Sequence, residues 1–496
     1  MEAASGTRAR IGAYLAPLVF ALLWLAPLPL SPEQQHLAAI VAAVVVAWTT
    51  EVIPIPATAM LIGPLMVACG ITDAKSALHP YADPLLFLFY GSFFIAAAMG
   101  RHGLDRRMAH AIVRHPLINA VPWRTRAAMM VTGMLLSMWI SNTASTAILM
   151  PILLGTFGVT STATAAESDP DDPQARALTG GLLAIAYACS IGGIGTLVGT
   201  PPNMITVRLL KEVGVELNFL DWSLIGLPAA VAITALIYLL FARLYPPGAI
   251  PQGATQASSS AMARADQPPR GPMGRGERAT ALTFALAIAG WLIPGALKAL
   301  DHPLAPALGK ALPAGGVAIL AASLLFILKD EDRRTTVLPW SEARNIDWGL
   351  IMLFGGGISL GTQMFETGLA RELGRGVIAL TGISDLWALT AIAILFTIFF
   401  TEVCSNTATS NMVIPLVIGV TSELGLSPVA PCLGVGLAAS CAFMMPIATG
   451  PNAIVYGTDR VPLSAMIRVG FILNLLCGVL IFAMLRILLP LYGWID

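Results

Sequence analysis

The sequence predicts an all-α polytopic membrane protein whose two halves repeat the same elements in inverted orientation. The 496 residues are 56% hydrophobic and only 11% charged, well below the share of about 25% that is usual in soluble domains. The mean hydropathy is +0.77. Apolar runs long enough to cross a bilayer, about 20 residues each with their flanks, recur along the whole chain. Three short blocks of sequence also occur twice, in the same order.

The composition argues against several classes of protein. The formal net charge is zero, which disfavours a nucleic-acid partner. The 6 cysteines and 6 histidines show no paired metal-ligand spacing, and no convincing nucleophile and base set occurs. A membrane-embedded enzyme is therefore disfavoured, and a primary pump is too, because the chain has no GxxxxGK[ST] phosphate loop.

Residues 1–35 are interpreted as an amino-terminal segment with a retained first helix, because no small-residue cleavage site follows its apolar run. Lys and Arg in short loops mark the cytoplasmic side of a membrane protein. The cluster from Arg101 to Arg126 should therefore be cytoplasmic, and helices near 11–30, 36–52, 54–72 and 84–100 then place the amino terminus there as well. We expect a multi-pass protein of the bacterial inner (plasma) membrane.

Residues 36–244 form the predicted first repeat. Its segment 127–155 carries a Ser-Asn-Thr sequence in its middle and Pro151 after it, which favours a re-entrant hairpin over a single span. A broken helix over 177–208 and a span over 223–243 are expected to follow.

A Pro/Gly/Ser/Ala-rich stretch, 245–278, is interpreted as a flexible cytoplasmic linker between the halves. The second repeat, 279–496, begins with helices near 279–298 and 312–328 and a span over 346–362. Its predicted re-entrant hairpin covers 386–420 and its predicted broken helix 426–456.

The prediction of two inverted halves rests on the repeated blocks. Ser405 and Pro415 follow Ser141 and Pro151 at one constant offset, and LFYG near 88 matches LFGG near 353. A third block pairs GTPPN at 199–203 with ATGPN at 448–452. By the charge argument the helices near 84–100 and 346–362 run in opposite directions, so the halves form an inverted repeat, which is typical of secondary transporters.

The chemistry of the hairpins and breaks favours a small anion held together with cations. Within 127–166, 177–207, 386–422 and 424–458 there is no Lys or Arg, with Arg176 at the border of one segment. An anion there therefore needs helix amino termini, hydroxyl and amide donors, and co-bound cations. Backbone carbonyls, hydroxyls and Asn amide oxygens are ligands that suit Na⁺. Glu402 is the one acidic residue there; it is a candidate proton or cation site, and a helix-end contact is the structural alternative.

These residues resemble the divalent anion/sodium symporter family, whose members carry dicarboxylates, tricarboxylates or sulfate. The resemblance covers nearly the whole chain: both Ser-Asn-Thr loops, TEVIPIP at 50–56, GGIGT at 192–196, the GTPPN block and the block ending in Pro451 and Asn452. It implies a scaffold domain that also forms a homodimer, and a mobile transport domain that moves like an elevator.

The resemblance also implies the binding residues. A first sodium site would use Ser137, Ser141, Asn142 and Gly199. A second would use Thr401, Cys404, Asn406 and Ala448. Substrate carboxylates would meet Asn142, Thr143, Thr200, Ser405, Asn406, Thr407 and Thr449. Gly450 departs from the family, which often has proline there, and this loosens the inference about substrate.

The predicted function is therefore sodium-coupled symport of a C4-type dicarboxylate, such as succinate, malate or fumarate, into the cell. The expected partners are this anion, sodium ions, the lipid bilayer and a second copy of the chain. Alternatives are a sodium-independent dicarboxylate exchanger and a carrier of citrate or sulfate. A sodium/proton antiporter or arsenite-type carrier, which would need an essential buried acid such as Glu402, is a further alternative.

Overall fold

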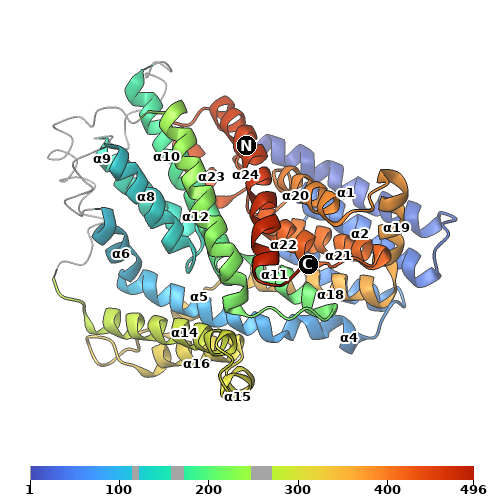
Figure 1. Ribbon diagram of the computed structural model, residues 1–496, viewed down its shortest axis with the longest axis horizontal. Coiled ribbons are helices and arrows are strands. Elements are labelled where there is room, and N and C mark those ends of the chain that lie inside the picture. The colour runs from blue at the N-terminus through green and yellow to red at the C-terminus, as the bar shows by residue number, and fades with distance from the viewer. Residues whose placement is uncertain (1, 114–121, 158–171, 247–270, 496) are drawn as a thin grey trace.

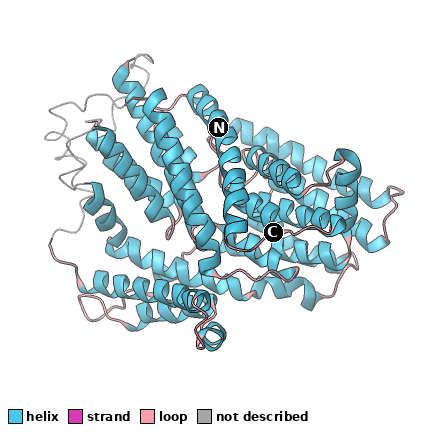
Figure 2. Ribbon diagram, in the orientation of Figure 1, coloured by secondary structure: helices cyan, strands magenta, loops and turns pink. Residues whose placement is uncertain are grey.

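The computed structural model describes residues 2–113, 122–157, 172–246 and 271–495. Within these ranges the chain is helical and has no strand, as Figure 2 shows. One isolated antiparallel β-bridge joins Lys329 to Thr336. Most of the predicted linker, and Arg114 of the basic cluster, lie outside the described residues.

The amino-terminal part of the chain forms seven consecutive elements: α1 (Glu2–Leu25), α2 (Pro32–Thr50), α3 (Ile55–Ala68), α4 (Ala74–Leu78), η1 (His79–Ala82), α5 (Pro84–His102) and α6 (Leu104–Val113). The elements up to the linker are α8 (Pro122–Ser137), α9 (Asn142–Thr156), α10 (Pro173–Gly192), η3 (Gly193–Gly195), α11 (Pro201–Glu212) and α12 (Phe219–Leu244).

The next helix, α14 (Arg275–Ala299), begins within the predicted linker of 245–278, and α15 (Ala305–Ala311), α16 (Ala314–Ile327) and α17 (Trp340–Ala343) follow it. The remaining elements are α18 (Trp348–Glu366), α19 (Leu369–Thr381), α20 (Leu386–Thr401), α21 (Asn406–Leu424), α22 (Val429–Ala438), α23 (Gly450–Tyr456) and α24 (Leu463–Leu491).

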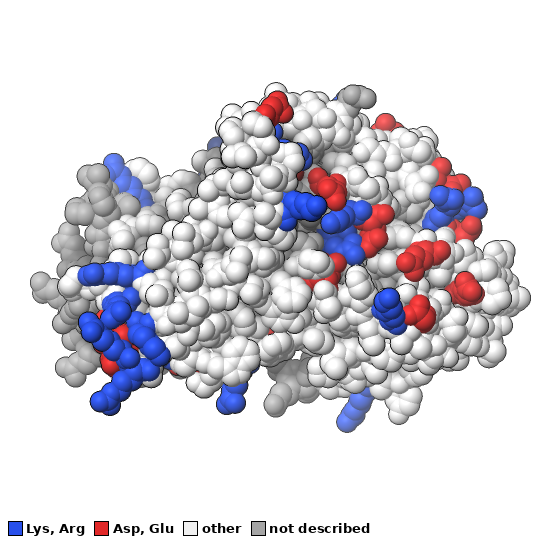
Figure 3. Space-filling model, turned by 90° about the horizontal axis from the view of Figure 1, so that it is seen from below, with Lys and Arg blue, Asp and Glu red and all other residues white. Residues whose placement is uncertain are grey.

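Many of these helices have the length and composition of membrane spans. Seven helices in the described part are long and apolar enough to cross a membrane, and two bent helix pairs raise this number to as many as nine. The charged residues visible in Figure 3 gather in separate groups with a broad uncharged surface between them. Such a surface suits the apolar interior of a bilayer, so the chain is a multi-pass membrane protein.

The helices of the two halves follow one order. In each half a long helix (α5 or α18) is followed by a short helix (α6 or α19), a helical hairpin (α8–α9 or α20–α21), a broken helix (α10–α11 or α22–α23) and a long closing helix (α12 or α24). The helix α10 is buried from Ala177 to Gly192, and it packs on α8, α9, α12 and α23. Along one edge of the molecule α5, α14 and α16 lie side by side (Figure 1).

Matching glycines explain one of the repeated sequence blocks. Gly91 lets α5 lie directly on α16, since a β-carbon there would come within 2.4 Å of the Ala318 backbone. Gly356 does the same for α18 on α3, where a β-carbon would lie 2.5 Å from the Ala59 carbonyl oxygen. The LFYG and LFGG blocks therefore specify two close helix contacts.

Candidate functional site

Both Ser-Asn-Thr sequences form the tip of a helical hairpin. Ser141 is the N-cap of α9, with φ −61° and ψ 144°, and its hydroxyl accepts a hydrogen bond from the Ala144 N–H at 3.2 Å. Ser405 is the N-cap of α21, with φ −65° and ψ 145°, and it accepts from the Ala408 N–H at 3.2 Å. Serine is among the best N-cap residues because its oxygen satisfies an otherwise unpaired N–H. The serine in each motif therefore begins the second helix of the hairpin.

The asparagine that follows each N-cap faces the first helix of its own hairpin. The Ser137 hydroxyl donates to the Asn142 side-chain oxygen at 2.5 Å, and the Thr401 hydroxyl lies 2.8 Å from the Asn406 side-chain oxygen. Ser137 and Thr401 are fully buried. These contacts gather side-chain oxygens at the base of each tip.

Further oxygens converge at both bases. A β-carbon built on Gly193 would lie 2.8 Å from the Asn142 side-chain oxygen and 3.0 Å from the Gly199 carbonyl oxygen, so both oxygens face one point. In the second half the Thr401 hydroxyl also lies 2.9 Å from the Ala439 carbonyl oxygen. A hydroxyl has one proton, so it cannot donate to both of its oxygen neighbours at once. Such clusters of uncharged oxygens suit a hard monovalent cation.

Each helix break is held by a buried asparagine from the helix that follows it. The Asn203 amide donates to the carbonyl oxygens of Gly193 and Thr196 at 2.9 and 2.6 Å. The Asn452 amide donates to those of Ala442 and Met445, both at 3.0 Å. Carbonyls freed from a helix in the membrane need such partners. Both asparagines therefore fix the backbone that turns toward the hairpin tips.

The second break has an additional support that the first one lacks. Glu402, at the end of α20, is 4% exposed, and its carboxylate accepts hydrogen bonds from the backbone N–H groups of Phe443, Met444 and Met445 at 2.7, 2.9 and 3.0 Å. The Asn474 amide of α24 donates to it as well, at 2.8 Å. Among the described residues no salt bridge reaches this carboxylate. Glu402 thus links the second hairpin, the second break and the closing helix.

One cavity of about 760 Å³ lies where both tips and both breaks meet. It is lined by all the predicted anion-binding residues except Ser405: Asn142, Thr143, Thr200, Asn406, Thr407 and Thr449. Of the predicted sodium ligands, Ser141, Asn142, Gly199, Asn406 and Ala448 also line it. The sequence thus led to residues that are far apart in the chain but share one cavity.

The remaining predicted residues lie behind the cavity wall. Ser137, Thr401 and Cys404 are buried and do not line the cavity. Ser405 is not among the lining residues either, and its hydroxyl caps α21. Its contact with the anion stays a prediction, and by capping α21 it also positions Asn406 and Thr407.

The opposite wall of the cavity comes from α5, the segment before α18 and the first turn of α18, which the sequence reasoning missed. The α5 wall consists of Phe89, Ser92, Phe93, Ala96, Ala97 and Gly100. These positions are spaced as on one face of a helix and include small and polar residues, so this part of the wall could have been predicted from the sequence pattern. Asn345, Ile346, Asp347 and Leu350 complete this wall.

The charges around the cavity have one sign. Its described lining includes Asp105, Glu342 and Asp347 but no Lys or Arg. Glu342 forms an ion pair with Arg101, and Asp347 caps α18 by accepting from the Leu350 N–H. Burial raises the pKa of Asp105, and its contacts with Arg106 oppose this only in part. An anion in this cavity has to be held by neutral donors and bound cations.

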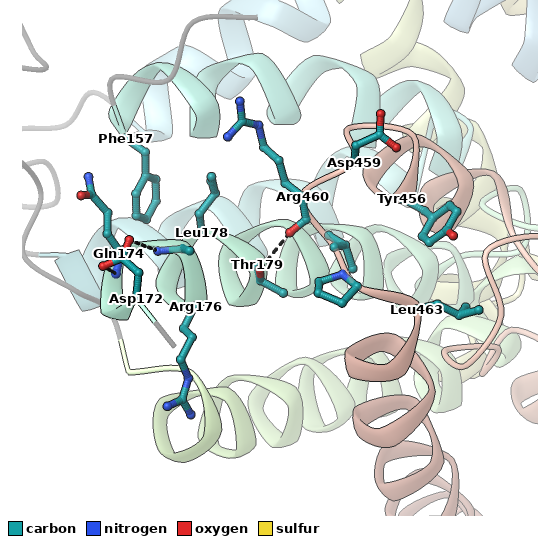
Figure 4. A pocket seen from close by; sticks show the side chains of 13 residues that line it. Phe157, Asp172, Gln174, Arg176, Leu178, Thr179, Tyr456, Asp459, Arg460 and Leu463 are labelled. Atoms are coloured by element: carbon teal, nitrogen blue, oxygen red, sulfur yellow. Dashed lines mark hydrogen bonds between the residues drawn. The ribbon is translucent and has the colours of Figure 1, made fainter. Parts of the chain in front are cut away.

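Two other cavities contain none of the predicted binding residues. The one drawn in Figure 4, of about 440 Å³, lies between the start of α10 and the link from α23 to α24. There Thr179 donates to the Arg460 carbonyl oxygen at 2.9 Å. A cavity of about 570 Å³ is lined by Asp83 and Arg208, which form an ion pair. The 760 Å³ cavity is therefore the candidate site.

A helical membrane bundle in which two hairpin tips and two helix breaks meet at one cavity has the architecture of a secondary transporter. A family model described as the sodium:sulfate symporter transmembrane region matches residues 8–494. The chain belongs to this family of membrane transporters, and it is not an enzyme.

Similar proteins with known sequences cover nearly the whole chain. An uncharacterized transporter of Haemophilus influenzae is 31% identical over 475 residues, which are 95% of each protein. The sodium-dependent dicarboxylate transporter SdcS of Staphylococcus saprophyticus is 31% identical over 490 residues, covering 97% of this chain and 91% of SdcS. SdcS of Staphylococcus aureus is 32% identical over 496 residues, covering 98% and 92%.

Two solved transporter structures share the overall fold. MtrF of Neisseria gonorrhoeae, from a class of antimetabolite efflux pumps, superposes with a TM-score of 0.58 at 12% identity, covering 95% of this chain and 97% of MtrF. The YdaH transporter of Alcanivorax borkumensis gives a TM-score of 0.50 at 15% identity, with 97% of each chain covered. At these identities the likeness concerns the fold alone.

Proposed function

We propose that the chain is a sodium-coupled symporter that imports a C4-type dicarboxylate such as succinate, malate or fumarate. The observation that carries this proposal is the meeting of both hairpin tips and both helix breaks at one cavity that has no Lys or Arg in its described lining. A dianion can be stable there only if cations bind with it. The SdcS proteins, named as sodium-dependent dicarboxylate transporters, add support.

Two sodium sites follow from the oxygens beside the tips. The first uses Ser137, Ser141, Asn142 and Gly199, and the second uses Thr401, Cys404, Asn406 and Ala448. The convergence of the Asn142 and Gly199 oxygens beside Gly193 supports the first site. The Thr401 hydroxyl, with two oxygen neighbours but one proton, supports the second.

The anion then binds between the two sodium ions. Its carboxylates accept hydrogen bonds from the amides and hydroxyls that line the cavity, namely Asn142, Thr143, Thr200, Asn406, Thr407 and Thr449. Each asparagine offers its oxygen to a cation and its amide nitrogen to the anion. This shared use couples the binding of ion and substrate.

The mobile unit of this proposal comprises the hairpins, the broken helices, α12 and α24. It moves as an elevator against α5, α18 and the helices packed on them, and two copies of the chain associate through this second group. The amino terminus is cytoplasmic and the membrane is the bacterial inner membrane. The cavity reaches the end of α5 that carries Arg101, so its opening faces the cytoplasm in this orientation.

Uptake of radiolabelled succinate into proteoliposomes tests the coupling. We expect uptake to require an inward Na⁺ gradient and to stop when K⁺ replaces Na⁺. Uptake that is unchanged in K⁺ but depends on internal dicarboxylate would identify a sodium-independent exchanger. A thermal-shift screen with succinate, citrate and sulfate, each with and without Na⁺, separates the substrate classes, because a bound ligand raises the melting temperature.

Substitution of the two motif asparagines tests the site. Asn142→Ala and Asn406→Ala should each reduce uptake at least about 100-fold, because each change removes a cation ligand and an anion donor together. Asn345→Ala is the matched control, since Asn345 lines the same cavity from the opposite wall. Uptake retained by both motif variants would remove the site assignment.

A further inference from the structure

Gly450 lies where the two halves of the site touch. It is the first residue of α23, it lines the cavity, and its counterpart in the first half is Pro201. A β-carbon built on Gly450 would lie 2.1 Å from the Thr143 hydroxyl oxygen and 3.1 Å from both the Cβ and the Cγ2 of Thr143. Real β-carbons are not found so close to an oxygen, so Thr143 occupies the space that any side chain at position 450 would need.

This contact joins the first hairpin to the second break. Thr143 is the second residue of α9, and α9 packs on α23. Because position 450 has no side chain, the hydroxyl of Thr143 lies against the backbone that follows Thr449. Hydroxyl-bearing residues of the two halves, Thr143 and Thr449, therefore line one stretch of the cavity wall.

We propose that Gly450 is a specificity-determining residue of the anion site, because its missing side chain lets Thr143 close on the second break and so fixes the distance between the two half-sites. This inference rests on the proposed function, since it concerns the fit of the transported dicarboxylate. A close approach of the halves suits a short dianion. A side chain at position 450 pushes Thr143 away and favours a longer one.

Gly450→Ala is the direct test, because alanine adds the β-carbon but keeps the backbone N–H. We expect its KM for succinate to rise about tenfold or more. This corresponds to the loss of about one hydrogen bond between the displaced Thr143 hydroxyl and the charged substrate. The KM for glutarate, which is one methylene longer, should change less, so the ratio of kcat/KM for succinate to that for glutarate falls. The thermal shift produced by Na⁺ alone should stay as in the parent, which also shows that the variant is folded.

A double-mutant cycle isolates the contact. Thr143→Ala removes the Oγ1 and Cγ2 atoms that the new β-carbon would meet, and by itself it should raise the KM for succinate. If the proposal holds, Gly450→Ala adds little further effect in the Thr143→Ala background, because the 2.1 Å clash with Oγ1 is gone and only the 3.1 Å contact with Cβ remains. Pro201→Ala, at the equivalent cavity-lining position of the first half, is the control and should leave the succinate to glutarate ratio unchanged.

The outcomes separate this inference from the proposed function. An unchanged succinate to glutarate ratio in Gly450→Ala, or fully additive effects in the cycle, overturns the role of Gly450. If the parent protein transports no dicarboxylate in a Na⁺ gradient, the proposed function fails, and the inference fails with it.

Discussion

At the scale of single residues, the buried carboxylate of Glu402 supports the second helix break. It accepts hydrogen bonds from the backbone N–H groups of Phe443, Met444 and Met445 and from the Asn474 amide. Hydrogen bonds to the charged form stabilise a buried carboxylate. Backbone partners of this kind have no signature in the sequence, whereas the motifs at 141–143 and 405–407 can be found by comparing the chain with itself.

Glu402→Gln should weaken the second break without changing the dependence of uptake on pH. The new amide group would face backbone N–H donors, and a buried donor without an acceptor costs about 1–3 kcal/mol. We expect a lower melting temperature and slower uptake at every pH. Glu423→Gln, in α21 of the same hairpin but at a half-buried ion pair with Arg375, is the control and should have little effect. Full stability combined with a shifted pH profile would instead make Glu402 a proton carrier.

Asp105 gives the cavity a negative charge that depends on pH. Burial raises its pKa, so it takes up a proton at a higher pH than an exposed aspartate does. As the pH falls through this raised pKa, the cavity loses one negative charge and should bind a dianion more tightly. Asp105→Asn makes that change permanent.

We therefore expect Asp105→Asn to lower the KM for the dianion at neutral pH, and to lower it less at acid pH, where the parent residue is protonated. Uptake measured across pH for the parent and the variant checks this, because titration of the substrate itself is common to both. Asp459→Asn, beside a different cavity, is the control. A ratio of the two KM values that is constant across pH would contradict the expectation.

At the scale of elements, the sequence predicted where helices break but not how long each break is. In the first half only residues 196–200 separate η3 from α11, whereas in the second half residues 439–449 lie outside any helix. Apart from Pro446, which disfavours a helix, the residues of the second break are mostly Ala, Ser, Cys and Met and are compatible with one. Glu402 supplies the physical reason for the longer break, because it binds the N–H groups that would otherwise continue the ladder of α22.

The two buried asparagines should matter equally for the two breaks. Leu at position 203 or at position 452 keeps the volume of the side chain but removes two hydrogen bonds to freed carbonyls. At about 1 kcal/mol for each bond, plus the penalty for carbonyls left unpaired, we expect a loss of about 2–4 kcal/mol in stability and a weaker thermal shift with Na⁺. Asn345→Leu, at an exposed position, is the control and should change neither the stability nor the thermal shift with Na⁺. A variant at 203 or 452 that behaves like this control would contradict the role of that asparagine.

At the scale of the whole molecule, the composition was sufficient to predict a helical membrane protein, because apolar runs report the bilayer directly. The short helices α6 and α19 were not predicted. They begin after Gly103 and Gly368, whose φ angles of 71° and 78° are natural for glycine, and they lack a long apolar run. In both turns a leucine, Leu104 or Leu369, follows the glycine, but this likeness does not show that a helix comes next.

An ion pair connects the two groups of helices in the elevator proposal, the mobile group and the fixed group. Asp83, the N-cap of α5, binds Arg208 of α11, and the two side chains are 5% and 14% exposed. Arg208 also pairs with Glu212, whose carboxylate accepts from the Thr362 hydroxyl of α18 at 3.4 Å. If α11 slides past α5 and α18 during transport, this network has to separate.

Asp83→Asn should therefore shift the population away from the conformation described here. Breaking one partner of a buried ion pair costs about 3–5 kcal/mol, and 1.4 kcal/mol already changes an equilibrium tenfold. Asparagine keeps the N-cap of α5, so the helix itself should persist.

Labelling measures this shift. A cysteine placed at Ala448 in the cavity should react more slowly in Asp83→Asn with a thiol reagent added from the cytoplasmic side. Asp83→Glu, which keeps both the charge and a carboxylate that can cap α5, is the control and should leave the labelling unchanged. Labelling unaffected by Asp83→Asn would mean that α11 and α5 move as one body.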